Sequence, residues 1–346
     1  MSTNSALPLR RLGKTGLMVT AIGFGGIPIQ MYDKANALAT VRRAHDMGVN
    51  FFDTARAYTV SEEWIGEALE GRDYIVATKS GVRDANGIYE EVCHSLRNLR
   101  RNQIDLYQFH GANYEVDIDK ILAPDGAMAG LLQAQAEGKI AHIGITGHRV
   151  DILIRALQVS ELFETVQVPF NIVEDQATAE LFPLCAHKNV GTIAMKPAGG
   201  GNFSNPALSV KWTLTQEVTV AIPGMGTVAE VEEDVSFALG NLALTPDELA
   251  ECDRMKAELG PRTCRRCNYC DPCPHGVNIF LALNGKAIMH RMGVQRFIDW
   301  GAKQVIEGAR NCQECGVCVT RCPYSLPIPE LIRENLAYYD TMPELG

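Results

Sequence analysis

Short apolar runs alternate with longer amphipathic stretches between residues 19 and 242. The amphipathic stretches, such as ALATVRRAHDM and SEEWIGEALEG, carry apolar residues three or four positions apart, which is the period of a helix packed on one face. The runs between them are apolar on both faces, as expected of parallel strands covered by helices. We therefore predict eight strands: VTAIGFGG (19–26), GVNFFD (48–53), YIVATK (74–79), IDLYQFH (104–110), AHIGIT (141–146), TVQVPF (165–170), GTIAMK (191–196) and VTVAIPG (218–224).

The regular alternation of strand and helix predicts an α/β fold with a parallel sheet, and eight units suggest a closed (β/α)8 TIM barrel. The stretch TPDELAECDRMKAELG (245–260) opens with a capping box, Thr245 and Glu248, and stops at Gly260 before a proline. We take this helix as the end of a barrel domain, residues 1–260, and predict a second domain, residues 261–346. Two amphipathic stretches, VNIFLALNGKAIMHRM and VQRFIDWGAKQVIEG, predict helices in the second domain.

Charge and hydropathy exclude several classes of partner. The chain of 346 residues has a net charge of −9 and no basic block, so we expect no nucleic-acid partner. No apolar run approaches the roughly 18 residues that a membrane span needs. The N-terminus, MSTNSALPLRRLGKTG, lacks the apolar core of a secretory signal, so we expect a cytoplasmic protein without a membrane partner.

The eleven cysteines are unevenly distributed. Cys93, Cys185 and Cys252 are isolated in periodic apolar segments, where cysteine acts as a small hydrophobic residue. The other eight fall in two short runs, CRRCNYCDPCP and CQECGVCVTRCP, and in a long intracellular chain such clusters indicate metal binding rather than disulfides. The predicted metal ligands are Cys264, Cys267, Cys270, Cys273, Cys312, Cys315, Cys318 and Cys322.

The spacing of these cysteines favours two [4Fe–4S] clusters. The second run has the bacterial ferredoxin spacing with a proline after its last cysteine, and the first run is one residue shorter before Cys273. Zinc is the alternative, but it usually takes two separated CxxC pairs. If the pairing follows two-cluster ferredoxins, the last cysteine of each run serves the other cluster. Cys322 then joins Cys264, Cys267 and Cys270, while Cys273 joins Cys312, Cys315 and Cys318.

Three consecutive apolar runs end on an ionisable residue: Asp53, Lys79 and His110. Tyr58 follows five residues after Asp53, in the loop beyond that strand. The C-terminal ends of barrel strands build the active site, so we expect these four side chains to converge at one mouth of the barrel. The alternative is a stabilising Asp–Lys pair with Tyr58 as a rim aromatic.

Residues 8–241 resemble an aldo-keto reductase, through LGKTGLMVTAIGFGG, FFDTARAY, ATKS and FHG. The barrel with its cysteine-rich tail is similar to the branch of that family that has a C-terminal ferredoxin-like domain with two clusters. The resemblance implies an oxidoreductase that reduces carbonyls or oxidises alcohols with NAD(H) or NADP(H). It also implies a catalytic tetrad of Asp53, Tyr58, Lys79 and His110, and a small helical iron–sulfur domain after the barrel.

These residue types suit hydride chemistry. We expect the Lys79 ammonium to lower the pKa of the Tyr58 phenol, ordinarily about 10, so that Tyr58 serves as general acid or base. Asp53 is expected to hold Lys79, and a neutral His110 to donate a hydrogen bond to the carbonyl oxygen.

The cofactor pocket implied by the resemblance departs from the family pattern. Thr146 and Gly147 replace the usual Ser-Asn pair, and Met195 replaces an aromatic residue. The stretch IPGMGTVAEVEEDV (222–235) lacks the basic residues that bind a 2′-phosphate, and Glu230 instead forms a capping box with Thr227, so NADH is favoured. The implied cofactor contacts are Gly25, Gly26, Asp53, Thr146, Gln167, Met195, Pro223 and Gly224.

The sequence leaves three functional interpretations open. The leading one is an oxidoreductase of aldo-keto reductase type acting on a small carbonyl or alcohol, coupled to two [4Fe–4S] clusters. The second is an electron-transfer protein with a redox partner protein, with a flavin as a conceivable cofactor, whose barrel no longer handles nicotinamide. The third is a redox sensor that binds a cofactor without turnover.

Overall fold

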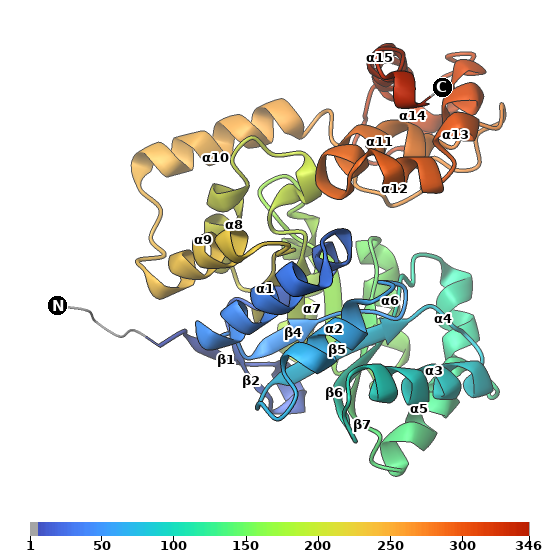
Figure 1. The fold of residues 1–346 in the computed structure, drawn as a ribbon. Helices are drawn as coiled ribbons and strands as arrows, with labels where there is room; N and C mark the ends of the chain where they lie inside the picture. Colours follow the sequence, from blue (N-terminus) through green and yellow to red (C-terminus); the bar gives the residue numbers. More distant parts are fainter. Residues whose placement is uncertain (1–5, 346) are drawn as a thin grey trace. The chain divides into compact units, whose positions relative to one another are not determined.

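The structure, a computed structural model, describes residues 6–345; the first residues of the N-terminal stretch considered above and Gly346 lie outside the described part. The chain divides into two compact units (Figure 1). The first extends to Pro246 apart from a short segment, Gly199–Ser204, which groups with the second unit from Asp247 onward. The sequence-based boundary after residue 260 stays a prediction. No helix among residues 6–345 is long and apolar enough to cross a membrane.

The first unit is built on eight parallel strands in sequential order, which confirms the predicted barrel. Isolated bridges join Ile22 to Ala221 and Gly25 to Gly224, so the first and last strands meet and the sheet closes. The strands are β3 (Phe24–Gly25), β4 (Phe51–Asp53), β5 (Ile75–Ser80), β6 (Ile104–Phe109), β7 (Ile140–Thr146), β8 (Thr165–Pro169), β9 (Gly191–Met195) and β10 (Val220–Ile222).

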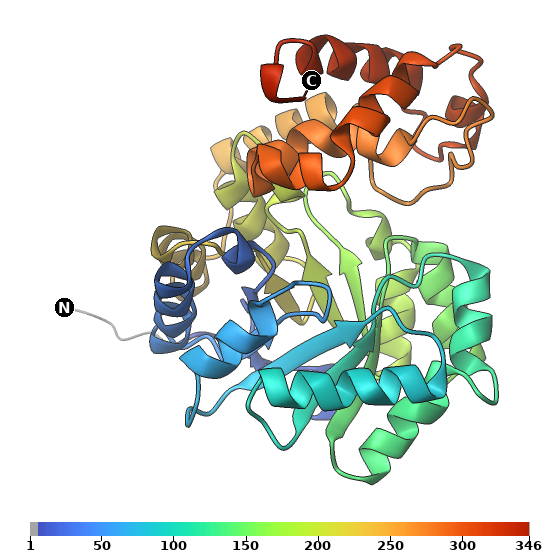
Figure 2. The ribbon, with the colours of Figure 1, turned by 45° about the vertical axis from the view of Figure 1, so that its right-hand side comes forward.

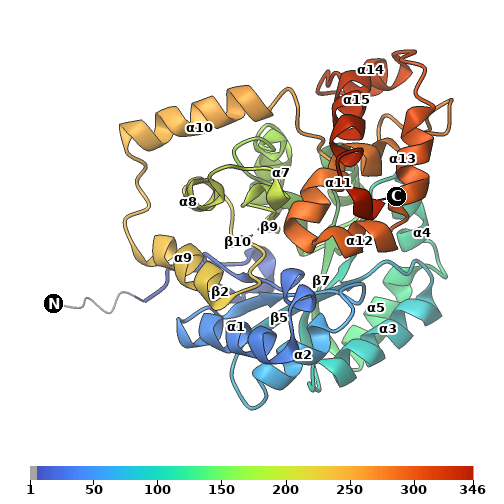
Figure 3. The same ribbon diagram turned by 45° about the horizontal axis from the view of Figure 1, so that its top comes forward.

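Helices surround these strands, as the amphipathic stretches predicted (Figures 2 and 3). Side chains at the N-caps fix where several of them begin: Asp33 accepts from Asn36 N and Asp84 from Gly87 N. The ring continues across the closure of the sheet, because the first helix packs against the last. The helices are α1 (Lys34–Asp46), α2 (Ser61–Ala68), α3 (Ala85–Asn98), α4 (Glu115–Leu122), α5 (Ala127–Ala136), α6 (Val150–Val159), α7 (Leu181–Lys188), α8 (Pro206–Leu214) and α9 (Val228–Leu239).

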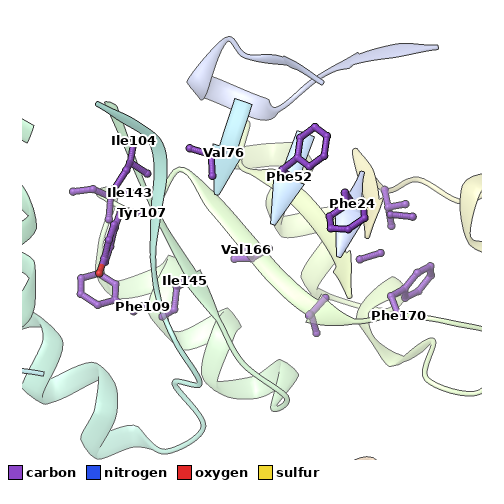
Figure 4. Packing of buried hydrophobic residues seen from close by; sticks show 14 of the residues in the cluster. Phe24, Phe52, Val76, Ile104, Tyr107, Phe109, Ile143, Ile145, Val166 and Phe170 are labelled. Atoms are coloured by element: carbon purple, nitrogen blue, oxygen red, sulfur yellow. The ribbon is translucent and has the colours of Figure 1, made fainter. Parts of the chain in front are cut away.

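Alternate residues of each strand pack in two different apolar cores. Phe52, Val76 and Tyr107 point outward and pack under the helices (Figure 4). Their inward neighbours form a separate cluster inside the barrel: Phe51, Ala77, Leu106, Ile193, Val220 and Ile222. Strands β1 (Leu9–Arg11) and β2 (Met18–Thr20) form a hairpin. Its residues Leu12 and Val19 pack in the inner cluster and close the barrel at the N-terminal ends of its strands. The opposite end is left for functional side chains.

The second unit is helical, as predicted, and has its own apolar core of fifteen buried residues. Helix α11 packs against α12, α13 and α15. The stretch predicted as one amphipathic helix breaks at Trp300–Gly301, where Gly301 adopts a left-handed conformation with φ of 85°. The helices are α10 (Pro246–Leu259), α11 (Ile279–Met292), α12 (Val294–Asp299), α13 (Ala302–Arg310), α14 (Val317–Arg321) and α15 (Ile328–Tyr339).

Gly130 of α5 allows that helix to approach α3 closely. A Cβ at this position would lie 2.1 Å from the backbone oxygen of Ala85, which cannot move aside easily. We expect Gly130→Ala to destabilise the barrel, because overpacking costs about 1–3 kcal/mol and outweighs the better helix propensity of alanine, about 1 kcal/mol. Thermal unfolding followed by circular dichroism measures this. Gly81→Ala is the control, since its Cβ would meet no atom within 4 Å. Equal midpoints for both variants would contradict the prediction.

Candidate active site

The inward positions at the C-terminal ends of the strands carry the polar residues of the barrel. On β4, β5, β6 and β9 they lie two residues beyond a member of the inner apolar cluster and therefore point to the same side of the strand. The strand register places Lys79 beside Gln108 and Thr146 beside Gln167. The inward set is Asp53, Lys79, Gln108, Thr146, Gln167 and Met195.

Asp53 and Lys79 form a buried ion pair. The Lys79 ammonium donates to both carboxylate oxygens of Asp53, at 2.7 and 2.8 Å, and to the backbone oxygen of Thr54 at 2.7 Å. The two residues are only 3% and 1% exposed. Burial lowers the pKa of Lys79, but the charges and hydrogen bonds of Asp53 and Tyr58 together outweigh this effect and raise the pKa above its usual value. Lys79 is therefore a fixed positive charge inside the barrel mouth.

Tyr58 and His110 complete the predicted tetrad. The Lys79 ammonium lies 5.1 Å from the centroid of the Tyr58 ring, and the Tyr58 and His110 rings meet edge to face with centroids 5.9 Å apart. The pKa of Tyr58 is raised, because burial of the phenol outweighs the attraction of Lys79. The expectation of a lowered pKa is therefore wrong for the protein without a bound ligand, although Lys79 does act in the expected direction.

His110 is held as a neutral imidazole. Its backbone N–H donates to Ser80 O at 2.8 Å, and its backbone oxygen accepts from the Arg83 guanidinium at 2.8 Å, which fixes the residue at the end of β6. Burial lowers the pKa of His110 to about 3, and the charges of Lys79 and Arg83 add to this effect. A neutral ring keeps one N–H donor for a ligand oxygen.

The predicted cofactor contacts are already engaged in hydrogen bonds within the barrel. The Gln167 side-chain oxygen accepts from Gln108 Nε2 at 2.9 Å, and the Thr146 hydroxyl accepts from Gly111 N at 2.9 Å. Gly25 lies so close to the last strand that a Cβ would stand 2.5 Å from Pro223 O, so only glycine fits there. Gly26 N donates to Asp53 O at 2.8 Å and supports the end of β4. Met195 is half-buried at the end of β9.

Two features of this mouth were not identified from the sequence. The first is Gln108, which orients Gln167 through a hydrogen bond. The alternation of residues along the strand IDLYQFH predicts that the Gln108 side chain points into the barrel. Lys196, which adopts a left-handed φ of 57°, contacts His148 with 2.6 Å between Nζ and Nε2. Lys196 ends the predicted strand 191–196 and His148 lies two residues beyond the predicted strand 141–146, which was the available signal.

Glu230, an acidic residue of α9 itself, takes part in capping the N-terminus of that helix. Glu230 N donates to the Thr227 hydroxyl at 3.3 Å, as the predicted cap requires. The Glu230 carboxylate accepts from Gly226 N at 2.6 Å. A negative charge thus occupies the helix start that would otherwise favour an anion.

In the second unit the eight clustered cysteines surround two separate hollows. One is lined by Cys264, Cys267, Cys270 and Cys322, and the other by Cys273, Cys312, Cys315 and Cys318. These are the two sets given by the crossed pairing. Within residues 6–345, no three His, Cys, Asp or Glu side chains are grouped tightly enough to hold a single metal ion.

The loops that carry these thiols use left-handed backbone at Arg266, Asn268 and Glu314. Arg266 N donates to Cys264 Sγ at 3.5 Å. A backbone N–H beside a thiol suits a negatively charged group held by thiolates. Each hollow has four sulfurs in its lining, the number that a [4Fe–4S] cluster takes.

Comparison with known proteins gives the same division. Residues 21–207 match the model of the aldo/keto reductase family, and residues 256–323 match that of a 4Fe-4S dicluster domain. L-galactose dehydrogenase from Arabidopsis thaliana is 29% identical over 302 residues, covering 71% of this chain and 93% of the relative. An aldo-keto reductase from Bacillus halodurans has a similar structure, with a TM-score of 0.62 and 25% identity over 72% of this chain and 96% of that one.

An aldo-keto reductase from Klebsiella pneumoniae, solved in complex with NADPH, shares the fold with a TM-score of 0.63 and 21% identity, covering 72% of this chain and 95% of that one. The barrel, the mouth of polar residues and the family match agree with one another. The chain belongs to the aldo/keto reductase family of oxidoreductases and carries a 4Fe-4S dicluster domain after its barrel.

Proposed function

We propose that this protein reduces a small carbonyl compound, or oxidises the corresponding alcohol, with a nicotinamide cofactor at the barrel mouth, and that it holds two [4Fe–4S] clusters in its second unit. The observation that supports the reaction best is the buried Asp53–Lys79 pair beside the Tyr58 ring. A structural ion pair alone does not need a phenol and a neutral imidazole at the same point.

The residues of the mouth suit proton transfer to a carbonyl oxygen. The bound nicotinamide supplies or accepts the hydride. Tyr58, a phenol that is ordinarily protonated at neutral pH, donates a proton to the oxygen as negative charge develops there. Lys79 stabilises the resulting phenolate, and Asp53 keeps the ammonium in place. His110 donates its N–H to the same oxygen and orients the substrate.

The thiol sets of the second unit suit two cubane clusters. Each hollow offers four sulfurs, three from one loop and one from the other run, which is the ligand arrangement of two-cluster ferredoxins. We assign Cys264, Cys267, Cys270 and Cys322 to one cluster and Cys273, Cys312, Cys315 and Cys318 to the other. A bound cluster would supply one-electron chemistry.

Tyr58→Phe removes the proton donor and keeps the ring. We expect carbonyl turnover to fall by at least about a hundredfold, the usual loss when general acid catalysis is removed, while nucleotide affinity changes little. Steady-state kinetics with a panel of aldehydes and ketones measures the first effect, and fluorescence titration measures the second. A variant with near wild-type turnover would show that Tyr58 is only a packing residue.

Protein purified without oxygen should contain about eight iron and eight sulfide per chain. Cys315→Ser should lose much of one cluster's iron, and adding Cys273→Ser should remove little more, because both residues belong to the same set. Combining Cys315→Ser with Cys322→Ser should affect both clusters. Iron and sulfide assays with electron paramagnetic resonance separate these cases, with Cys93→Ser as the control. Stoichiometric zinc with negligible iron would reject the cluster assignment.

NADH should bind at least as tightly as NADPH, because Glu230 places negative charge at the start of α9 and that helix has no basic residue. Calorimetric titration of both nucleotides measures the ratio. Glu230→Gln keeps the size of the side chain and removes its charge, so it should shift the ratio toward NADPH. A tenfold preference of the wild type for NADPH, about 1.4 kcal/mol, would contradict this prediction.

A further inference from the structure

The loop that carries Tyr58 is held by a network on the outer side of the strands. Arg56 lies in the β4–α2 connection, between Asp53 and Tyr58. Its backbone N–H donates to Lys79 O at 3.0 Å, so the connection is tied to β5 at the lysine of the tetrad. Its guanidinium is 22% exposed and points toward the helices. It forms ion pairs with two carboxylates, that of Glu62 at 2.9 Å and that of Glu91 at 3.0 Å.

Glu62 is the centre of this network. It is 1% exposed, and a carboxylate so deeply buried needs a full set of donors. One oxygen accepts from Thr78 Oγ1 and Ser95 Oγ, both at 2.7 Å, and the other accepts from Arg56 at 2.9 Å and Asn98 Nδ2 at 3.0 Å. Thr78 is the outward neighbour of Lys79 on β5. The carboxylate therefore joins the tyrosine loop, β5 and α3 at one point.

Other hydrogen bonds of the turn between Arg56 and α2 are local or lie at the surface. Tyr58 N donates to Ala55 O at 3.0 Å, Ser61 N donates to Tyr58 O at 2.8 Å, and the Thr59 hydroxyl donates to the Gln30 side-chain oxygen at 3.0 Å at an exposed position. Thr59, a β-branched residue, adopts a left-handed φ of 44°, which is unfavourable unless the surroundings impose it. The ion pair of Arg56 with Glu62 is an anchor of this turn outside its own backbone.

We propose that Arg56 and Glu62 are positioning residues, whose ion pair fixes the β4–α2 turn and thereby the place of Tyr58 beside Lys79. This inference rests on the proposed function. Neither side chain needs to touch the substrate, since they act through the backbone that carries the phenol. Arginine is required because its planar fork binds two carboxylates at once, which a lysine cannot do with the same geometry.

Loss of the anchor has a defined electrostatic consequence. The charged groups around Tyr58 are Asp53 on β4 and Lys79 on β5, and the neutral His110 ring after β6 also contacts it. Burial raises the pKa of Tyr58, Lys79 lowers it and Asp53 raises it. A Tyr58 that leaves its place changes both its burial and its distance from the ammonium, so its pKa shifts. A role limited to stability would lower the unfolding temperature and leave the acidity of Tyr58 unchanged.

The test measures the acidity of Tyr58 directly and needs no substrate. Holoprotein labelled with carbon-13 at the tyrosine ring carbon bearing oxygen is titrated with alkali and followed by nuclear magnetic resonance, and Tyr58→Phe assigns the resonance. We expect Arg56→Met to shift the Tyr58 pKa by about one unit, a tenfold change in acidity. Arg56→Lys should recover part of the shift. Arg100→Met is the matched control, because Arg100 also bridges two glutamates, Glu67 of α2 and Glu70 just after that helix, but at the exposed surface.

Kinetics give the second readout. Arg56→Met should lower kcat about tenfold or more and leave nucleotide affinity within about twofold. Glu62→Gln, which keeps the side-chain size, tests the same anchor if Arg56→Met does not fold. An unchanged Tyr58 resonance titration in both variants would overturn the inference. The failure of the proposed function looks different: Tyr58→Phe itself would then leave turnover unaffected.

Discussion

The buried contact between Asp53 and Lys79 is the constraint on which the barrel mouth depends. Two opposite charges inside a protein are tolerated only with good geometry and additional hydrogen bonds, and Lys79 has both through Asp53 and Thr54 O. Because Asp53 is the last residue of β4 and Lys79 the penultimate residue of β5, the pair also fixes the ends of these strands relative to each other. Every other group of the site is arranged around this fixed positive charge.

The sequence predicts most of this arrangement because barrel geometry is periodic. Eight apolar runs place eight strands, and residues at their ends converge because parallel strands share one C-terminal face. The tetrad is predictable for this reason. The pKa of Tyr58 is not, because it depends on how deeply the phenol is buried, and burial depends on packing from several loops. The contact of Gln108 with Gln167 needs the relative stagger of two strands distant in sequence, which periodicity alone does not give.

In the second unit, too, the local sequence pattern predicts some features, while others depend on tertiary packing. Cysteine spacing predicts which thiols gather, because three of each set lie within one loop. The break between α12 and α13 was missed, since a glycine inside an amphipathic pattern is compatible with either a helix or a turn. The buried network of Glu62 was also missed. In SEEWIGEALEG, Glu62 stands three and seven positions before Ile65 and Leu69, on the apolar face of the helix, but the spacing does not show the four donors that satisfy its buried carboxylate.

The interleaving of the two cysteine runs has a consequence for the order in which the protein is made. The set that begins at Cys264 is completed only by Cys322, whereas the barrel strands end at Ile222. A ribosome moving from the N-terminus therefore releases every barrel strand before either thiol set is complete. The barrel core contains none of these eight cysteines, so its packing needs no metal. If the thiol sets hold the proposed clusters, a shortage of iron in the cell would act on the second unit and leave the packing inside the barrel without a missing part.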